Sequence, residues 1–353
     1  MQQPAAALPI PNPSPRPASN LNGLRSFLRF VLAALYFLLA RVFAHHGAIG
    51  LVTEEWVPLV EQAMLVFLLL LGYAGMAFVL DRQLQPVSRQ GLSLRPGWLG
   101  EIGLGLAFGW GIAVVCVLPM VLLGGIAMHL SLSGPAFGWL LADATYFALA
   151  TLAVQVAFRG YPFEKAIAAI GEIPAALMLS VLYGIFRAWL PGASRASMGV
   201  SIALGLLLSM AYLRTRALWL PWGLHFGWVA TRALFFGLPV SGVSSHSPMV
   251  QGDPMARLGL TGGVFGLDGT WLAFWILLIA MPFLYRATRD LSYYHNAPIL
   301  EPGGIPVDLD AAQRQQHEAA MGEQAPAAPA LVQILPVASA PPPVISELDG
   351  PRD

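Results

Sequence analysis

The chain has 353 residues, of which 56% are hydrophobic and only 11% are charged, and its formal net charge is zero. Soluble globular domains carry about 25% charged residues, so this composition, with a mean hydropathy of +0.64, excludes an ordinary soluble domain and predicts a multi-pass membrane protein. The zero net charge gives no indication of a nucleic-acid partner. The single cysteine, Cys116, excludes an internal disulfide and is expected to be buried, because it lies in an apolar run.

The two ends of the chain differ from its middle. Residues 1–23 are rich in proline and alanine and lack the apolar core of a signal peptide, so we expect a disordered segment there. Residues 286–353 have a similar composition and predict a disordered cytoplasmic tail. The apolar runs between them lie near the roughly 20 residues that cross a membrane, and they cover residues 26–44, 57–80, 98–128, 136–158, 173–190, 198–213, 217–238 and 270–285. The expected fold class is all-α, a multi-pass transmembrane helical bundle of about eight spans.

Basic residues predict which side of the membrane each loop faces. If the N-terminus is cytoplasmic, the inside loops contain Arg82, Arg89, Arg95, Arg159, Lys165, Arg214, Arg216, Arg286 and Arg289. The outside loops contain few basic residues, and the first of them holds Glu54 and Glu55. Because cytoplasmic loops carry an excess of Lys and Arg, we expect a protein of the cell membrane with both termini in the cytoplasm. Residues 239–269 would then lie outside, and their glycines predict turns.

Three pairs of residues at i, i+4 spacing place polar side chains in three different apolar runs. They are Gln155 and Arg159 in the fourth run, Tyr183 and Arg187 in the fifth, and His225 and Val229 in the seventh. Residues four apart share one helix face, and polar groups are costly inside a membrane. Three such faces turned towards one another predict an intramembrane polar pocket.

Short pieces around these pairs resemble a known family. They are AFRGYPF (157–163), SVLYGIF (180–186), AYLRTRALWLPWGLHFGW (211–228), GLPVSG (237–242) and LTGGVFG (260–266). In this order and spacing, over roughly residues 140–270, the chain resembles the CPBP family of intramembrane proteases, which includes the type II CAAX prenyl endopeptidases. The resemblance implies a CPBP-like core over residues 136–285, preceded by N-terminal transmembrane helices over residues 24–135.

The resemblance also implies site residues and their chemistry. The family pattern has a Glu-Glu pair before FRG, an aromatic-x-x-x-His motif and a later His-x-x-x-Asn motif. Its glutamates and histidines activate water for peptide-bond hydrolysis, directly or through a metal. Three positions match the pattern, namely Arg159, Tyr183 and His225. Four positions depart from it, namely Val154 and Gln155 at the glutamates, Arg187 at a histidine and Val229 at the asparagine.

These departures argue against catalysis. A general base must accept a proton near the working pH, and neither Val154 nor Gln155 has a group that does so. A catalytic zinc takes about three ligands from His, Cys or carboxylates, and at the motif positions only His225 remains. We therefore expect no cofactor, and a catalytically silent relative that binds a membrane protein, peptide or lipid in the former substrate cavity.

Two other functions stay open. An active intramembrane endopeptidase of the CAAX type would need a rearranged site with a different base. A small-molecule transporter would be expected to show paired broken helices in two matching halves, and the sequence has no such pairs.

Each polar residue in the apolar runs also has a purely structural interpretation. Arg159 would be a topology anchor, His225 a hydrogen-bonded core histidine, and Arg187 a side chain that extends to the outer surface. The sharper hypothesis is that Arg187, His225 and Gln155 form a pocket for an anion, such as a lipid phosphate or a peptide carboxylate. A buried guanidinium needs a partner. Within the chain, Asp143 is the candidate partner of Arg187, and if the two do not pair, an anion from outside the chain is expected to bind Arg187.

Overall fold

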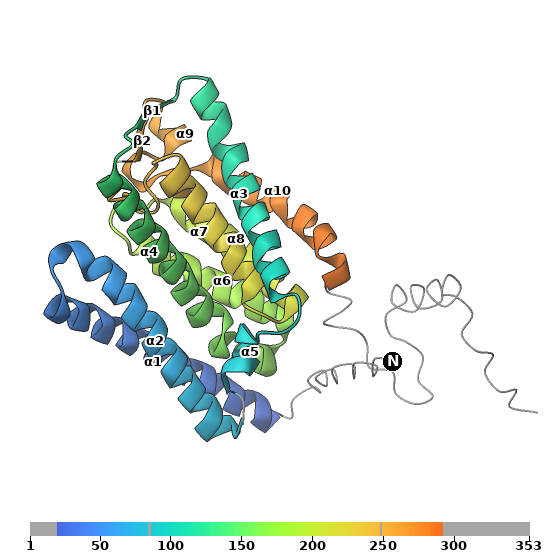
Figure 1. The fold of residues 1–353 in the computed structure, drawn as a ribbon. Coiled ribbons are helices and arrows are strands. Elements are labelled where there is room, and N and C mark those ends of the chain that lie inside the picture. Colours follow the sequence, from blue (N-terminus) through green and yellow to red (C-terminus); the bar gives the residue numbers. More distant parts are fainter. Residues whose placement is uncertain (1–19, 84–85, 248, 292–353) are drawn as a thin grey trace, which may run out of the picture. The chain divides into compact units, whose positions relative to one another are not determined.

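The computed structural model describes residues 20–83, 86–247 and 249–291, which form a bundle of helices (Figure 1). The main helices are α1 (Asn20–Leu51), α2 (Val57–Asp81), α3 (Trp98–Leu122), α4 (Gly134–Arg159), α5 (Tyr161–Ile170), α6 (Glu172–Ala188), α7 (Arg195–Thr215), α8 (Trp219–Ala230) and α10 (Trp271–Ala287). The shorter segments are η1 (Glu54–Trp56), η2 (Ser88–Leu92), η3 (Thr231–Phe235), α9 (Leu258–Thr261), η4 (Gly263–Phe265), η5 (Leu267–Gly269) and two strands, β1 (Ile126–Leu130) and β2 (Val250–Pro254). The predicted all-α fold of a multi-pass membrane protein is confirmed.

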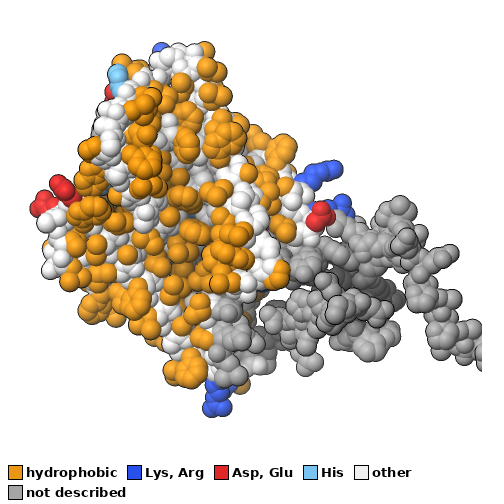
Figure 2. Space-filling view, in the orientation of Figure 1, with side chains coloured by type: hydrophobic (Ala, Val, Ile, Leu, Met, Phe, Trp, Pro, Cys, Tyr) orange, Lys and Arg blue, Asp and Glu red, His pale blue; other side chains and the backbone are white. Residues whose placement is uncertain are grey.

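Five segments of the described chain are long and apolar enough to cross a membrane. They cover residues 21–51, 54–81, 98–122, 134–170 and 195–215. The helices α6, α8 and α10 are shorter than the roughly 20 residues that a span requires, although each coincides with one of the eight predicted apolar runs. Figure 2 shows hydrophobic side chains over most of the face in view, with the charged ones at its edges.

One predicted span, residues 98–128, extends too far. The helix α3 ends at Leu122, and Gly124 follows with a φ of +70°, a conformation that ends helices. The chain then enters β1, which pairs antiparallel with β2, so that Ala127 lies opposite Asp253. A short apolar run fits a strand as well as a helix end, and the pairing with a distant segment decides between them.

The described residues reach slightly into both predicted tails. The helix α1 begins at Asn20, inside the segment 1–23 that the composition predicts to be disordered. The helix α10 continues to Ala287, just past the predicted start of the tail at residue 286. Residues 1–19 and 292–353 lie outside the described residues, so their disorder stays a prediction.

The closest helix contact joins α3 to α8. It is made by glycines four residues apart on both helices, Gly105 and Gly109 on α3 and Gly223 and Gly227 on α8. A Cβ atom on Gly105 would lie 2.7 Å from the nitrogen of Leu224, and one on Gly227 would lie 2.6 Å from the oxygen of Leu106. Small residues let helix backbones approach in this way, and the contact fixes the position of α8 in the bundle.

The motif-bearing helices lie at the centre of the bundle. The helix α4 packs between α2 and α8, and α7 packs against α6, α8 and α10. The strands and α9 gather at one end of the bundle, which we call the loop end and which comprises β1 and residues 239–269, whereas α5 lies at the opposite end (Figure 1). The helices α4, α6 and α8 therefore run between the two ends with their motif residues in between.

Candidate functional site

The helices α4 and α8 meet through two motif side chains. The amide nitrogen of Gln155 lies 3.0 Å from Nδ1 of His225, and both side chains are buried. An amide nitrogen only donates, so Nδ1 accepts this hydrogen bond and a neutral ring carries its proton on Nε2. The face of α4 that carries Gln155 and the face of α8 that carries His225 therefore meet, as the sequence predicts.

Arg159 closes α4 but does not lie at the surface. Its side chain is buried, and Nη2 donates to the backbone oxygen of Gly205, in the middle of α7, at 2.8 Å. Its guanidinium carbon lies 5.8 Å from the ring centre of Tyr183 on α6. Arg159 therefore does not act as a surface anchor, because its side chain folds back into the bundle where polar partners are available. The side of the membrane on which this end of α4 lies stays a prediction.

Arg187 finds its partner in the loop end, not in α4. Its Nη2 lies 3.5 Å from Oδ2 of Asp268, whose Oδ1 accepts from Nη1 of Arg232 at 2.8 Å. The hydroxyl of Ser241 also donates to this carboxylate. Arg232 in turn donates from Nε to the backbone oxygen of Trp228 at 2.9 Å. Two guanidiniums therefore share a single carboxylate inside the protein.

Asp268 is ionised in this arrangement. Burial by itself would raise the pKa of its carboxyl group, but the guanidiniums of Arg232 and Arg187 and the hydroxyl of Ser241 outweigh burial. The pKa of Asp268 is therefore held below its usual value. A carboxylate in this state is a counter-ion and not a proton acceptor at neutral pH.

Asp143, the expected partner of Arg187, has another role. Its Oδ2 accepts from the hydroxyl of Ser245 at 2.6 Å and from the backbone nitrogen of Ser247 at 2.8 Å, and its Oδ1 lies 2.9 Å from Nδ1 of His246. The expected ion pair is wrong, because the segment 245–247 folds over the start of α4 and occupies this carboxylate. Asp143 therefore anchors the loop end to the bundle.

The other motif positions complete the centre of the site. Tyr183 is buried, and its ring centre lies 6.0 Å from the guanidinium carbon of Arg187, close to the distance it keeps from Arg159. Val229 is buried and Val154 is partly buried, both within the apolar core. At the two positions where the family pattern has glutamates, the chain thus has an apolar side chain, Val154, and an uncharged amide, Gln155.

The donor set does not fit a catalytic metal. Within the described ranges, no three side chains of the His, Cys, Asp and Glu types come together as metal ligands. His225 is bonded through Nδ1 to an amide, and a zinc site takes about three such protein ligands. The residues present therefore fit a polar interior better than a zinc centre.

Sequence reasoning missed the role of the loop end. Neither Asp268 nor Arg232 stands at a motif position, so the motifs did not predict their roles in the site. The signal that could have joined them is the cost of a buried guanidinium, which requires a counter-charge from some part of the chain. The glycine-rich pieces 237–242 and 260–266 bring this counter-charge into place. The backbone N–H of Ser241 donates to the backbone oxygen of Phe265 at 3.0 Å, and this bond holds the two pieces together beside Asp268.

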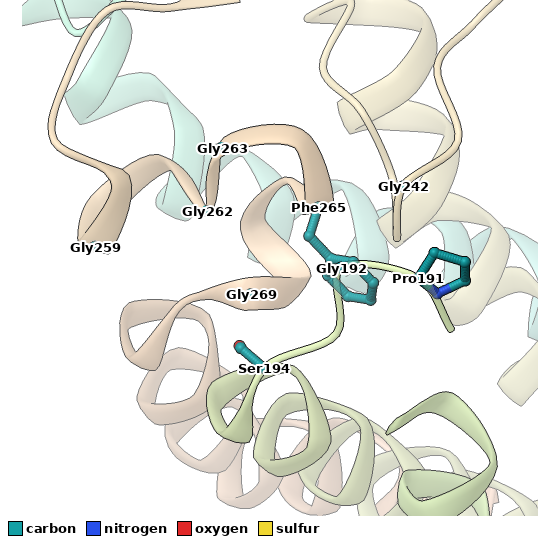
Figure 3. A pocket seen from close by; sticks show the side chains of 9 residues that line it. All are labelled: Pro191, Gly192, Ser194, Gly242, Gly259, Gly262, Gly263, Phe265 and Gly269. Carbon is teal, nitrogen blue, oxygen red and sulfur yellow. The ribbon is translucent and has the colours of Figure 1, made fainter. Parts of the chain in front are cut away.

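A cavity of about 420 Å³ lies at the loop end, and no motif residue lines it. Figure 3 shows it between two glycine-rich turns and the start of α7. Its lining consists of Pro191, Gly192, Ser194, Gly242, Gly259, Gly262, Gly263, Phe265 and Gly269. This lining contains no charged or titratable side chain, and the hydroxyl of Ser194 already caps α7 by accepting from the nitrogen of Ser197. We therefore place the candidate site at the motif residues and not in this cavity.

Comparison with known proteins agrees with the motifs. Residues 136–231 match the family model described as Rce1-like, type II CAAX prenyl endopeptidase Rce1-like. The match runs from α4 to the start of η3 and includes every motif position named above. No curated protein and no solved structure matches the chain.

Proposed function

We propose that this chain, which its residues 136–231 place in the CPBP family of membrane proteins, is a catalytically silent member of that family. In this proposal it binds a membrane protein, peptide or lipid in the interior where the family's substrate cavity would lie. Binding would replace cleavage, because the groups that would activate water are missing from the motif positions.

The hydrogen bond between Gln155 and His225 is the observation that carries the proposal. His225 is bonded to the amide of Gln155. The family pattern has a glutamate carboxylate at the position of Gln155. An amide does not accept a proton near neutral pH, so Gln155 leaves His225 without an anionic partner to stabilise an imidazolium. Val154 and Val229 add only apolar surface to the same interior.

The alternative, an active endopeptidase with a rearranged site, depends on Asp268. This carboxylate is bonded to Arg187, which stands at a motif position. Asp268 is engaged by Arg187, Arg232 and Ser241, however, so it would have to leave these partners before it served as a base. Catalytic silence is therefore the better-supported function.

A cleavage assay separates the two functions. The full chain, purified in neutral detergent, is incubated with prenylated CAAX peptides, and its zinc content is measured. We expect no cleavage and no stoichiometric zinc. A variant that combines Val154→Glu, Gln155→Glu, Arg187→His and Val229→Asn restores the family pattern and is the positive comparison. Cleavage by the unmodified chain that His225→Ala abolishes would establish the active endopeptidase instead.

The same proposal includes an orientation in the cell membrane, with both termini in the cytoplasm. Cys116 is buried, so an added cysteine can be labelled with little background. Ser244 is an exposed residue of the loop end, and Ser339 lies outside the described residues. We expect a membrane-impermeant thiol reagent on intact cells to label Ser244→Cys and not Ser339→Cys. The reverse pattern would invert the orientation.

A further inference from the structure

The interior of the bundle holds more positive than negative charge. Arg159, Arg187 and Arg232 are linked through shared neighbours, since Tyr183 lies near the first two and Asp268 binds the last two. The arginines carry three positive charges and Asp268 carries one negative charge. Uncompensated charge in a low-dielectric interior is costly. A further anion would therefore stabilise this group of three arginines and Asp268, which we call the arginine cluster.

Guanidinium donors of the cluster remain without protein partners in the described part of the chain. They are Nε and Nη1 of Arg159, Nε of Arg187 and Nη2 of Arg232. Arg159 is 1% exposed and Arg232 is 0% exposed, so bulk water does not satisfy these atoms. Arg159 has the strongest need, because its one hydrogen bond goes to the neutral carbonyl group of Gly205.

Two other carboxylates on the loop-end side of the bundle are already engaged. Asp143 binds the segment 245–247 through both of its oxygens. Glu61 on α2 pairs with His45 on α1 at 2.8 Å. Neither one is bonded to the arginine cluster, and in the described part of the chain the cluster's guanidiniums are ion-paired only with Asp268. The compensating anion that we infer is therefore a ligand.

The surroundings of Arg159 are aromatic and apolar. The ring of Phe158 lies 5.2 Å from that of Tyr183 and 5.9 Å from that of Phe186. Phe37 of α1 packs against both Phe158 and Phe186, with ring centres at 5.8 Å and 5.6 Å. A ligand whose anionic group reaches the arginine cluster would therefore place the rest of its structure against hydrocarbon.

We propose that Arg159, together with Arg187 and Tyr183, binds the oxyanion headgroup of an anionic amphiphile, a carboxylate or a phosphate. Its apolar chain lies against Phe158 and Phe186. A guanidinium presents a planar fork of donors that matches both oxyanions. The inference rests on the proposed non-catalytic function and names the chemistry of the ligand that this function would use.

A binding experiment tests this site with simple probes. The full chain is delipidated in neutral detergent and titrated with dodecanoate, dodecyl phosphate and uncharged dodecanol, and the thermal midpoint of unfolding is followed. We expect both anions to raise the midpoint and dodecanol to leave it unchanged. Arg159→Gln should weaken binding of the anions by about tenfold or more, because it removes a buried charge partner. Arg216→Gln is the matched control, since Arg216 pairs with Glu172 near the surface at the α5 end.

The outcomes decide each part of the proposal. Equal stabilisation by dodecanol, or full anion binding by Arg159→Gln, would overturn the site. Acetate or inorganic phosphate that binds as tightly as the dodecyl anions would overturn the role of the apolar chain. A response to dodecanoate alone assigns a carboxylate, and a response to dodecyl phosphate alone assigns a phosphate.

A second variant covers the case in which Arg159→Gln does not fold. Asp268→Asn leaves the cluster with one more positive charge, so a dodecyl anion should restore part of the stability that this variant loses, and dodecanol should not. Equal restoration by the two would overturn the site. Peptide cleavage by the unmodified chain would refute the proposed function itself, whereas absence of both cleavage and anion binding would refute only the ligand.

Discussion

The two faces of α8 make different kinds of contact: one packs against a neighbouring backbone, and the other forms polar bonds. On one face, Gly223 and Gly227 bring the backbone of α8 against that of α3, with no room for a side chain. On the other, His225 bonds to α4, and Arg232 in the following π-helix bonds to Asp268 in the loop end. The first face excludes polar groups by close packing, whereas the second admits them and has to compensate their charge.

The difference shows how one helix can combine a contact that depends on shape with contacts that depend on the chemistry of each partner. A backbone contact between glycines depends on shape alone and holds α8 in place whatever occupies the interior. A polar face depends on the identity of each partner, so a change at one position forces a change at another. In this chain the polar face carries the bonds of His225 and Arg232, and the glycine face packs α8 closely against α3.

The largest expected effect is on the polar face, from Asp268→Asn. The substitution leaves the buried guanidinium of Arg232 and the partly buried one of Arg187 without their shared counter-ion. Breaking a buried ion pair costs about 3–5 kcal/mol. Unfolding in neutral detergent, followed by thermal or denaturant titration, should show this loss in the free energy of unfolding. Asp253→Asn is the control, because the side chain of Asp253 is 67% exposed. Equal stability of the two variants would mean that the arginine cluster does not depend on Asp268.

A smaller effect is expected on the glycine face, from Gly109→Ala. Its Cβ atom would lie 2.5 Å from the nitrogen of Trp228, so α3 and α8 would have to separate. Overpacking of this kind costs about 1–3 kcal/mol. Gly111→Ala on the same helix is the matched control, since nothing lies within 4 Å of a Cβ at Gly111. The control should be as stable as the parent or up to about 1 kcal/mol more stable, and similar losses in both variants would refute the close contact.

The smallest effect is expected where α4 meets the loop end, from Asp143→Asn. The amide would bind Ser245 and Ser247 more weakly than the carboxylate does, which should lower the free energy of local opening by about 1–2 kcal/mol. Hydrogen exchange in residues 243–247 reports this opening directly. Ser244→Ala, at an exposed neighbouring position, should leave the exchange unchanged. Unaltered exchange in Asp143→Asn would mean that the loop end is held by other contacts.

Much of the fold could be predicted from local sequence. Apolar runs near the length of a membrane span located the helices. The i, i+4 spacing of the motif pairs placed Gln155 on the face of α4, and His225 on the face of α8, at which these two helices meet. The glycines of α3 and α8 also carry a readable signal, four residues apart on each helix. Spacing alone, however, does not tell which two helices such glycines join, because that depends on the packing of the whole bundle.

Composition, helix periodicity and motif spacing by themselves determined that this is a multi-pass helical membrane protein with a polar interior at Gln155, Tyr183 and His225. These properties follow from residues that are near one another in the chain. Tertiary structure alone decided that Arg187 pairs with Asp268, 81 positions away, and that Arg159 folds into the bundle. Hydropathy records the cost of burying a charge but not the identity of its partner, and the partner is set by whichever loop the completed fold brings to the buried group.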